Sequence, residues 1–300
     1  MKPLRALLLY LAVVLLGAAA LAPWVWRAVH AGWPDGTIAQ QPFHRYVNRC
    51  LLGLALLGLW PLLRALGANS WKSIGADQPF SERRNWRNGI VFGWGSLGGA
   101  AVIAVLSGGR IWNLTADPNL WLKHAANALG AALLVSVLEE LLFRGAVFSA
   151  LRRAGSFTWA AGLSSGLYAF VHFFQRPPSP TVITSGSGFI ILGQMLTGFT
   201  DWRALVPGWL TLSLAGWLLA LARERTRRIW FGVGLHAGWI FWLKSYGFAT
   251  TPTGTAIAGS LWGSDKLYDG WLALGVLVVT GLILHRTTVL APHSPHHARS

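Results

Sequence analysis

Residues 131–151 have the sequence AALLVSVLEELLFRGAVFSAL, which places Glu139, Glu140 and Arg144 inside an apolar run long enough to cross a bilayer. Each ionisable group near the middle of a membrane costs about 2.5–3.5 kcal/mol on insertion scales. Such residues are therefore rare in membrane helices, and by default they indicate a functional site. The stretch predicts a membrane helix that carries the candidate site of this protein.

The composition of the whole chain also indicates a membrane protein. Of its 300 residues, 53% are hydrophobic and only 12% are charged, against roughly 25% charged in soluble domains. The eighteen tryptophans fit the enrichment of this residue at membrane–water interfaces. The net charge of +15 lies mainly in short loops between apolar runs. This pattern favours contact with the lipid bilayer, particularly anionic lipid, over nucleic-acid binding.

The apolar runs predict an all-α fold, a polytopic transmembrane helical bundle of about eight spans. Each run has close to the ~20 residues that a membrane helix needs. We expect the spans at about 6–26, 47–66, 89–108, 124–151, 157–175, 204–222, 229–248 and 270–285. Residues 188–199 are too few to cross, and we expect them to lie in the interface or to re-enter.

The distribution of Lys and Arg predicts the orientation. Counted over the loops, fifteen fall on one side of the predicted bundle and nine on the other. By the positive-inside rule, both termini are then cytoplasmic. Lys2 and Arg5 before the first apolar run also resemble a secretory signal. Pro23 and the continued run through Trp24 and Trp26 favour an uncleaved span. The short loops are typical of a prokaryotic cell-membrane protein.

The charged cluster has a simple helical geometry. Glu140 and Arg144 are four residues apart, so on an α-helix they share a face and can form an ion pair. Glu139 points about 100° away from Glu140. One carboxylate is thus held by arginine while its neighbour faces a cavity. Alternatively, the glutamates pair with Arg144 only to lock helices together, an interpretation that accounts for Arg144 and one glutamate but not for the second acid.

Two histidines lie in later apolar runs. His172 follows Tyr168 by one turn, and His236 lies between glycines that permit close helix approach. With an unpaired acid, two imidazoles could activate water and stabilise charge. Glu139, His172 and His236 would also satisfy zinc, although no H-E-x-x-H motif is present. His172 falls nearer the extracytoplasmic end of its span than the other two, so bringing them together requires a helix displacement of about 10 Å.

Three motifs in order resemble one known family. EELLFR (139–144) resembles the E-E-x-x-x-R motif of the CAAX protease and bacteriocin-processing family, intramembrane proteases related to the type II CAAX prenyl endopeptidases. YAFVH (168–172) resembles the second motif, F-x-x-x-H, and GLHAGW (234–239) resembles the third. The resemblance covers roughly 124–248, the four-helix core of the family. We therefore expect N-terminal spans in 1–120, the protease-like core in 121–248, and a loop, last span and polar tail in 249–300.

The resemblance implies a glutamate-dependent peptidase that acts on a peptide or membrane-protein substrate. Glu139 would be the general base that activates water, assisted by His172. Glu140 and Arg144 would orient the site, with Tyr168 in support. His236 would help to stabilise the tetrahedral oxyanion. Some accounts of the family propose a metal instead, and the motifs leave a divalent metal such as zinc open.

Two departures from the motifs bear on activity. Tyr168 stands where the second motif has phenylalanine, which retains the ring. Ile240 stands where the eukaryotic-like third motif has asparagine. A missing oxyanion donor can cost 10²–10³ in rate, and Gln175 or Gln194 are possible substitutes.

Two other classes of protein stay open. One is a catalytically weakened or inactive membrane scaffold or immunity-type protein that binds a peptide in the same cavity. The other is a proton-coupled transporter that uses the acid and histidines as a relay. Such a transporter would be expected to have paired broken helices in two halves, and the Gly and Pro pattern gives no clear sign of them.

Overall fold

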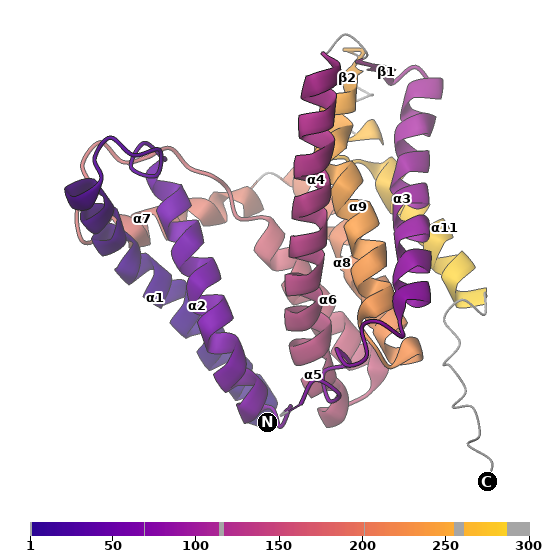
Figure 1. Ribbon diagram of the computed structural model, residues 1–300, viewed down its shortest axis with the longest axis horizontal. Coiled ribbons are helices and arrows are strands. Elements are labelled where there is room, and N and C mark those ends of the chain that lie inside the picture. Colours follow the sequence, from indigo (N-terminus) through magenta and orange to yellow (C-terminus); the bar gives the residue numbers. More distant parts are fainter. Residues whose placement is uncertain (1, 69, 114–116, 201, 255–260, 287–300) are drawn as a thin grey trace. The chain divides into compact units, whose positions relative to one another are not determined.

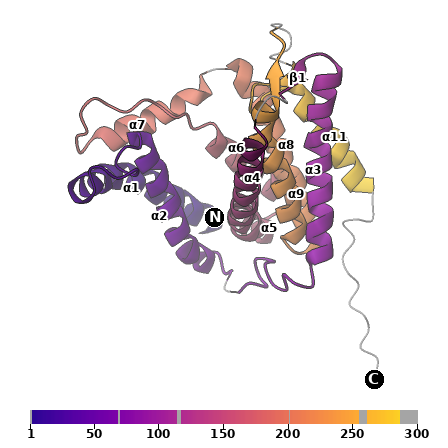
Figure 2. The same cartoon turned by 45° about the horizontal axis from the view of Figure 1, so that its top comes forward.

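A computed structural model of the chain describes residues 2–68, 70–113, 117–200, 202–254 and 261–286 (Figures 1 and 2). The described part is mainly helical and forms two compact units. The first comprises residues 1–69 and 170–201, and the second comprises residues 70–169 and 202–300. The tail histidines His293, His296 and His297, for which we expect a solvated tail rather than a metal site, lie outside the described residues.

The first unit is built on a pair of long helices, with two shorter ones beside them. Its elements are α1 (Lys2–Gly32), α2 (Phe43–Ala65), α7 (Ser187–Met195) and the 3₁₀ helix η2 (Leu196–Phe199). α1 packs along α2, and α7 packs on α1. Gly188 permits the contact of α7 with α1, because a side chain at this position would collide with the backbone of Ala19. Residues 173–186, which connect α6 to α7, are not helical.

The second unit contains the charged cluster. Its helices are α3 (Arg83–Leu106), α4 (Pro118–Glu139), the π-helix η1 (Glu140–Phe148), α5 (Ser149–Ala154), α6 (Phe157–His172), α8 (Trp202–Thr226), α9 (Trp230–Ala249) and α11 (Trp271–Arg286). The last three residues of α6 belong to the first unit. Two short strands, β1 (Arg110–Trp112) and β2 (Thr250–Pro252), pair antiparallel with Ile111 opposite Thr251.

Helix α9 is the centre of this unit and lies between α3 and α4 (Figure 1). Its contact with α3 is glycine-lined on both sides. A Cβ added at Gly89 or Gly93 would collide with the backbone of α9, and one added at Gly234 or Gly238 would collide with the backbone of α3. Small residues at helix interfaces let backbones approach closely in membrane proteins. The glycines that flank His236 thus serve the close approach that the sequence predicts.

The predicted all-α membrane bundle is confirmed. Four of the described helices are long and apolar enough to cross a membrane by length and composition: α1, α2, α3 and α8. α11 and the segment Ser187–Phe199 are shorter apolar helices. The total of about eight spans stays a prediction, as do the interfacial position of 188–199 and the three predicted chain divisions.

Two features differ from the predicted elements. The fourth apolar run is not one regular α-helix, because it becomes π-helical from Glu140 to Phe148. A π-helical turn inserts extra residues into the helix and is often found at functional sites. The second difference is the β1–β2 pair. β1 follows the predicted span 89–108 and β2 follows the predicted span 229–248, in segments where the sequence predicts loops. Its strands have only three residues each, too few to leave an alternating pattern.

Candidate active site

Five polar side chains of the second unit meet inside the helix bundle. Glu139 is the last residue of α4, and Glu140 and Arg144 belong to η1. Tyr168 lies on α6, and His236 lies on α9. Four of these side chains are at most 3% exposed, whereas the Glu139 side chain is 25% exposed. The predicted site residues other than His172 therefore form one cluster.

The Glu140 carboxylate contacts two other members of this cluster, Arg144 and His236. Its Oε1 lies 3.2 Å from Arg144 Nη1, which is the predicted ion pair, and 3.2 Å from His236 Nδ1. Its Oε2 faces Gly232 of α9, where an added Cβ would lie only 2.8 Å from this oxygen. A buried charge is tolerated when it is paired and hydrogen-bonded. Glu140 meets this requirement by contact with an arginine and an imidazole from two different elements.

Arg144 is held on three sides. Besides the contact with Glu140, its Nη2 donates a hydrogen bond of 3.2 Å to the carbonyl oxygen of Gly216 on α8. Its guanidinium lies over the Tyr168 ring, 4.7 Å from the ring centroid. A cation over an aromatic face gains more when both are desolvated, as they are here. Arg144 thus joins η1, α6 and α8 around the cluster.

The partners of His236 determine which ring nitrogen carries the hydrogen. An ionised carboxylate can only accept, so His236 Nδ1–H donates to Glu140 Oε1 at 3.2 Å. In the neutral imidazole, Nε2 then accepts the hydrogen of the Tyr168 hydroxyl, 3.1 Å away. The same Nε2 lies 3.7 Å from Glu139 Oε2. His236 is thus oriented by Glu140 at one nitrogen, with the other nitrogen turned toward Tyr168 and Glu139.

The two adjacent glutamates have different environments, as the sequence predicts. Glu140 is 1% exposed and belongs to the buried ion pair. Glu139, with a quarter of its side chain exposed, is the more accessible acid of the cluster. The histidine beside Glu139 in the second unit is His236, a pairing that the motifs do not indicate.

His172, Gln175 and Gln194 lie in the first unit. The two glutamines are the residues named above as substitutes for the missing oxyanion donor. His172 is the last residue of α6. Gln175 and Gln194 line a groove of about 360 Å³ together with Arg176 and Thr197. The predicted roles of His172 beside Glu139 and of the two glutamines as oxyanion donors stay predictions.

The surroundings of Ile240, which stands where the third motif has asparagine, are apolar. Ile240 is 8% exposed and packs in an apolar cluster with Ala132 and Ala237, so it provides no polar group. Across the described residues, no group of three or more His, Cys, Asp or Glu side chains is arranged to hold a metal ion. His172 belongs to the first unit, whereas Glu139 and His236 belong to the second, and the role of these three residues as zinc ligands stays a prediction.

Among the described residues of the second unit, two cavities can be outlined, and one of them adjoins the cluster. It has a volume of about 20 Å³ and is lined by residues that include Tyr168, His236, Thr211, Trp239 and Tyr268. Sequence analysis does not identify Tyr268, because the apolar pattern and the motifs carry no sign of where its loop folds.

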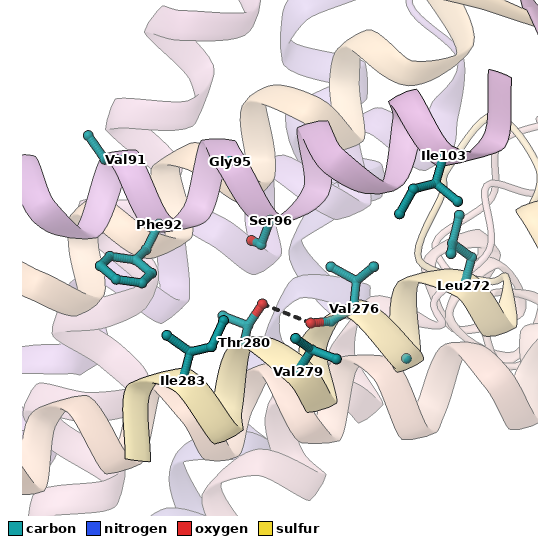
Figure 3. A pocket seen from close by; sticks show the side chains of 11 residues that line it. Val91, Phe92, Gly95, Ser96, Ile103, Leu272, Val276, Val279, Thr280 and Ile283 are labelled. Carbon is teal, nitrogen blue, oxygen red and sulfur yellow. Dashed lines mark hydrogen bonds between the residues drawn. The ribbon is translucent and has the colours of Figure 1, made fainter. Parts of the chain in front are cut away.

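The other cavity is a groove of about 730 Å³ between α3 and α11 (Figure 3). Among its described lining residues, the polar side chains are Ser96 and Thr280, and Thr280 donates to the carbonyl of Val276 within its own helix. None of the described lining residues has a titratable side chain. Ser96 connects the two regions, because it accepts a 2.9 Å hydrogen bond from Trp239 Nε1.

The fold and the cluster define a helical membrane protein with a buried, acid-containing polar site. Residues 121–242 match the model of a protein family described as type II CAAX prenyl endopeptidase Rce1-like. The match contains all six predicted site residues and confirms the resemblance that the motifs indicate. Searches of curated proteins and of solved structures gave no significant match.

Proposed function

We propose that this protein is an intramembrane endopeptidase that hydrolyses a peptide bond of a protein or peptide substrate at the membrane. The family match supports the protease class, since its members are described as endopeptidases. The observation that carries the proposal is the contrast within the acid pair. Glu139 is 25% exposed and lies 3.7 Å from His236, while Glu140 is buried against Arg144. In this proposal Glu139 contacts water, while Glu140 holds His236 by a hydrogen bond.

In the proposed reaction Glu139 is the general base. Its carboxylate takes a proton from a water molecule, assisted by His172, and the resulting hydroxide attacks the carbonyl carbon of the scissile bond. The carbonyl oxygen becomes an oxyanion in the tetrahedral intermediate. When the carbon–nitrogen bond breaks, Glu139 returns the proton to the leaving amine. The products are a new carboxyl terminus and a new amino terminus.

His236 is proposed to stabilise the oxyanion. The Glu140 carboxylate accepts the hydrogen of His236 Nδ1 at 3.2 Å, and it would stabilise a positive imidazolium, as the aspartate does in a Ser-His-Asp triad. For this role His236 first takes a proton from solvent at Nε2, the nitrogen that otherwise accepts from Tyr168, and the resulting Nε2–H is the donor for the oxyanion. Donors fixed in advance of the reaction are often the largest single contribution to such catalysis. Arg144 and Tyr168 hold this arrangement in place.

A prokaryotic cell membrane with both chain termini in the cytoplasm is the proposed location. In that setting prenylated proteins are improbable substrates. We infer that the substrate is instead a secreted peptide or the membrane-anchored terminal tail of a protein.

One observation favours a second candidate function. Ile240 is buried against Ala132 and Ala237, so the position where the motif has asparagine supplies no oxyanion donor. A protein weakened in this way would bind a peptide in the same cavity without turnover, as a membrane scaffold or immunity-type protein. Its biological effect would then survive Glu139→Gln.

The test compares protein termini in membranes from cells that carry the wild type, Glu139→Ala or Glu224→Ala at matched expression. Glu224 is a matched acidic control, because it pairs with Arg152 away from the cluster. We expect new termini with the wild type and Glu224→Ala, and none with Glu139→Ala. Full cleavage by Glu139→Ala would overturn the proposed role of this acid. Identical termini in all three membranes would favour the scaffold.

A further inference from the structure

The small cavity beside the cluster contains a tyrosine from outside the family match. Tyr268 lies in the loop 263–270, just before α11, and lines the same cavity of about 20 Å³ as Tyr168 and His236. We propose that Tyr268 is a positioning residue of the candidate active site, whose hydroxyl holds the Tyr168 hydroxyl in place against His236. This inference rests on the proposed function, and it adds to that site a residue beyond residues 121–242.

The hydrogen-bonding capacity of a tyrosine explains how Tyr268 would act. The Tyr168 hydroxyl lies 3.1 Å from His236 Nε2, and a tyrosine oxygen can accept a hydrogen bond as well as donate one. A cavity of about 20 Å³ has room for about one water molecule. In the proposed arrangement the Tyr268 hydroxyl donates to Tyr168 directly or through one water. A hydrogen bond accepted by Tyr168 strengthens the one that it donates, since chains of hydrogen bonds polarise one another.

The loop that carries Tyr268 has a fixed conformation. The backbone N–H and the hydroxyl of Ser264 donate to the Asp269 carboxylate at 2.8 and 2.5 Å. Leu267 has a φ of 62°, a left-handed conformation that is unusual for a bulky side chain. Its side chain is nevertheless fully buried in the core of the second unit. Such a conformation persists only where the surroundings determine it strongly, so the residue after Leu267 is also held in place.

A buried arginine fastens the same loop to the rest of the unit. Arg110 of β1 is 1% exposed and donates to Asp265 at 2.8 Å and to the Thr250 hydroxyl at 2.7 Å. Its guanidinium lies over the ring of Tyr246 on α9, 4.4 Å from the centroid. The Tyr246 hydroxyl in turn donates to the carbonyl of Trp262 at 3.0 Å. The loop is therefore connected to the helix that carries His236.

The first experiment uses the full-length protein in lipid and the substrate identified by the comparison of termini. We expect Tyr268→Phe to lower kcat about three- to tenfold, the effect of about one hydrogen bond, with KM changed less than about twofold and the melting temperature preserved. Tyr10→Phe is the matched control, because it removes a hydroxyl bonded to Ala55 in the first unit. An unchanged kcat in Tyr268→Phe would overturn the inference.

A double-mutant cycle tests whether Tyr268 acts through Tyr168. If it does, Tyr268→Phe has no further effect on kcat in a Tyr168→Phe background. Two losses that multiply independently would overturn the proposed mode of action. If the wild type and Glu139→Ala give identical termini, the failure belongs to the proposed function, and the kinetic test does not apply.

A spectroscopic measurement tests the inference without turnover. With ring-¹⁵N-labelled histidine, the Nε2 resonance of His236 can be assigned by its loss in His236→Gln. We expect this resonance to shift in Tyr268→Phe and to stay in place in Tyr10→Phe. An identical Nε2 resonance in wild type and Tyr268→Phe would show that Tyr268 does not position this histidine.

Discussion

Glu140 Oε1 lies 3.2 Å from His236 Nδ1, and the same oxygen lies 3.2 Å from Arg144 Nη1. One carboxylate oxygen thus joins the π-helical segment η1 to the central helix α9. Its neighbour Glu139 lies farther from the histidine, with 3.7 Å between its Oε2 and His236 Nε2. The two acids should therefore respond differently to substitution.

Glu140→Gln should be much less stable than Glu139→Gln. Removing one partner of a buried ion pair typically costs about 3–5 kcal/mol, because the other charge stays buried without compensation. Arg144 would be left in that state. Glu139 is partly exposed, so its replacement should change stability little while it abolishes cleavage. Thermal unfolding of the two variants in the same lipid or detergent measures the difference, and equal losses would contradict it.

Gly232→Ala should disturb the site without changing any of its polar residues. The added Cβ would lie 2.8 Å from Glu140 Oε2, so the carboxylate or α9 must shift. Overpacking of this kind typically costs about 1–3 kcal/mol. Gly130→Ala in α4 is the control, because nothing lies within 4 Å of its added Cβ. The melting temperature should fall for Gly232→Ala and hold or rise for Gly130→Ala, and a fall in both would show that glycine replacement itself is responsible.

Gly93→Ala should separate α3 from α9. Its Cβ would collide with the backbone at Leu235, next to His236. Backbone cannot move aside as the end of a side chain can, so we expect a loss of both stability and cleavage. Gly99→Ala is on the same helix and meets nothing within 4 Å, so it should behave like the wild type. Unfolding and cleavage measured in parallel test this prediction, which a wild-type-like Gly93→Ala would contradict.

Ser96→Ala should be more costly than Thr280→Ala, although both side chains line the apolar groove in Figure 3. Ser96 accepts the hydrogen of Trp239 Nε1, and Trp239 is 3% exposed. Loss of this acceptor leaves a buried donor unsatisfied, at about 1–3 kcal/mol. Thr280 bonds only within its own helix and should contribute little. Denaturation of both variants gives the comparison, and a larger loss in Thr280→Ala would be the contrary result.

The helices and the acid pair were predictable because their causes are local. Apolar runs of about 20 residues predict helices close to those observed, such as 229–248 for Trp230–Ala249. Charges in such a run identify the cluster, and the four-residue spacing predicts the contact of Glu140 with Arg144. The contact between Tyr168 and His236 spans 68 residues and depends on how α6 and α9 pack. The position of Tyr268 at the cavity beside His236 depends on the β1–β2 pair and on Arg110, and no periodic pattern in the sequence reveals these contacts.

The glycine-lined contact between α3 and α9 has one of its two helices outside the family match. The match begins at residue 121, after α3 has ended, so the helix that fills the glycine face of α9 is encoded upstream of it. The loop with Tyr268 is encoded downstream, and residues 170–201 within the match belong to a different compact unit. A fragment cut at 121 and 242 would retain every motif residue and lose the surfaces that align them. Grafting these motifs onto another membrane protein would therefore require α3 and the 263–270 loop to be transferred with them.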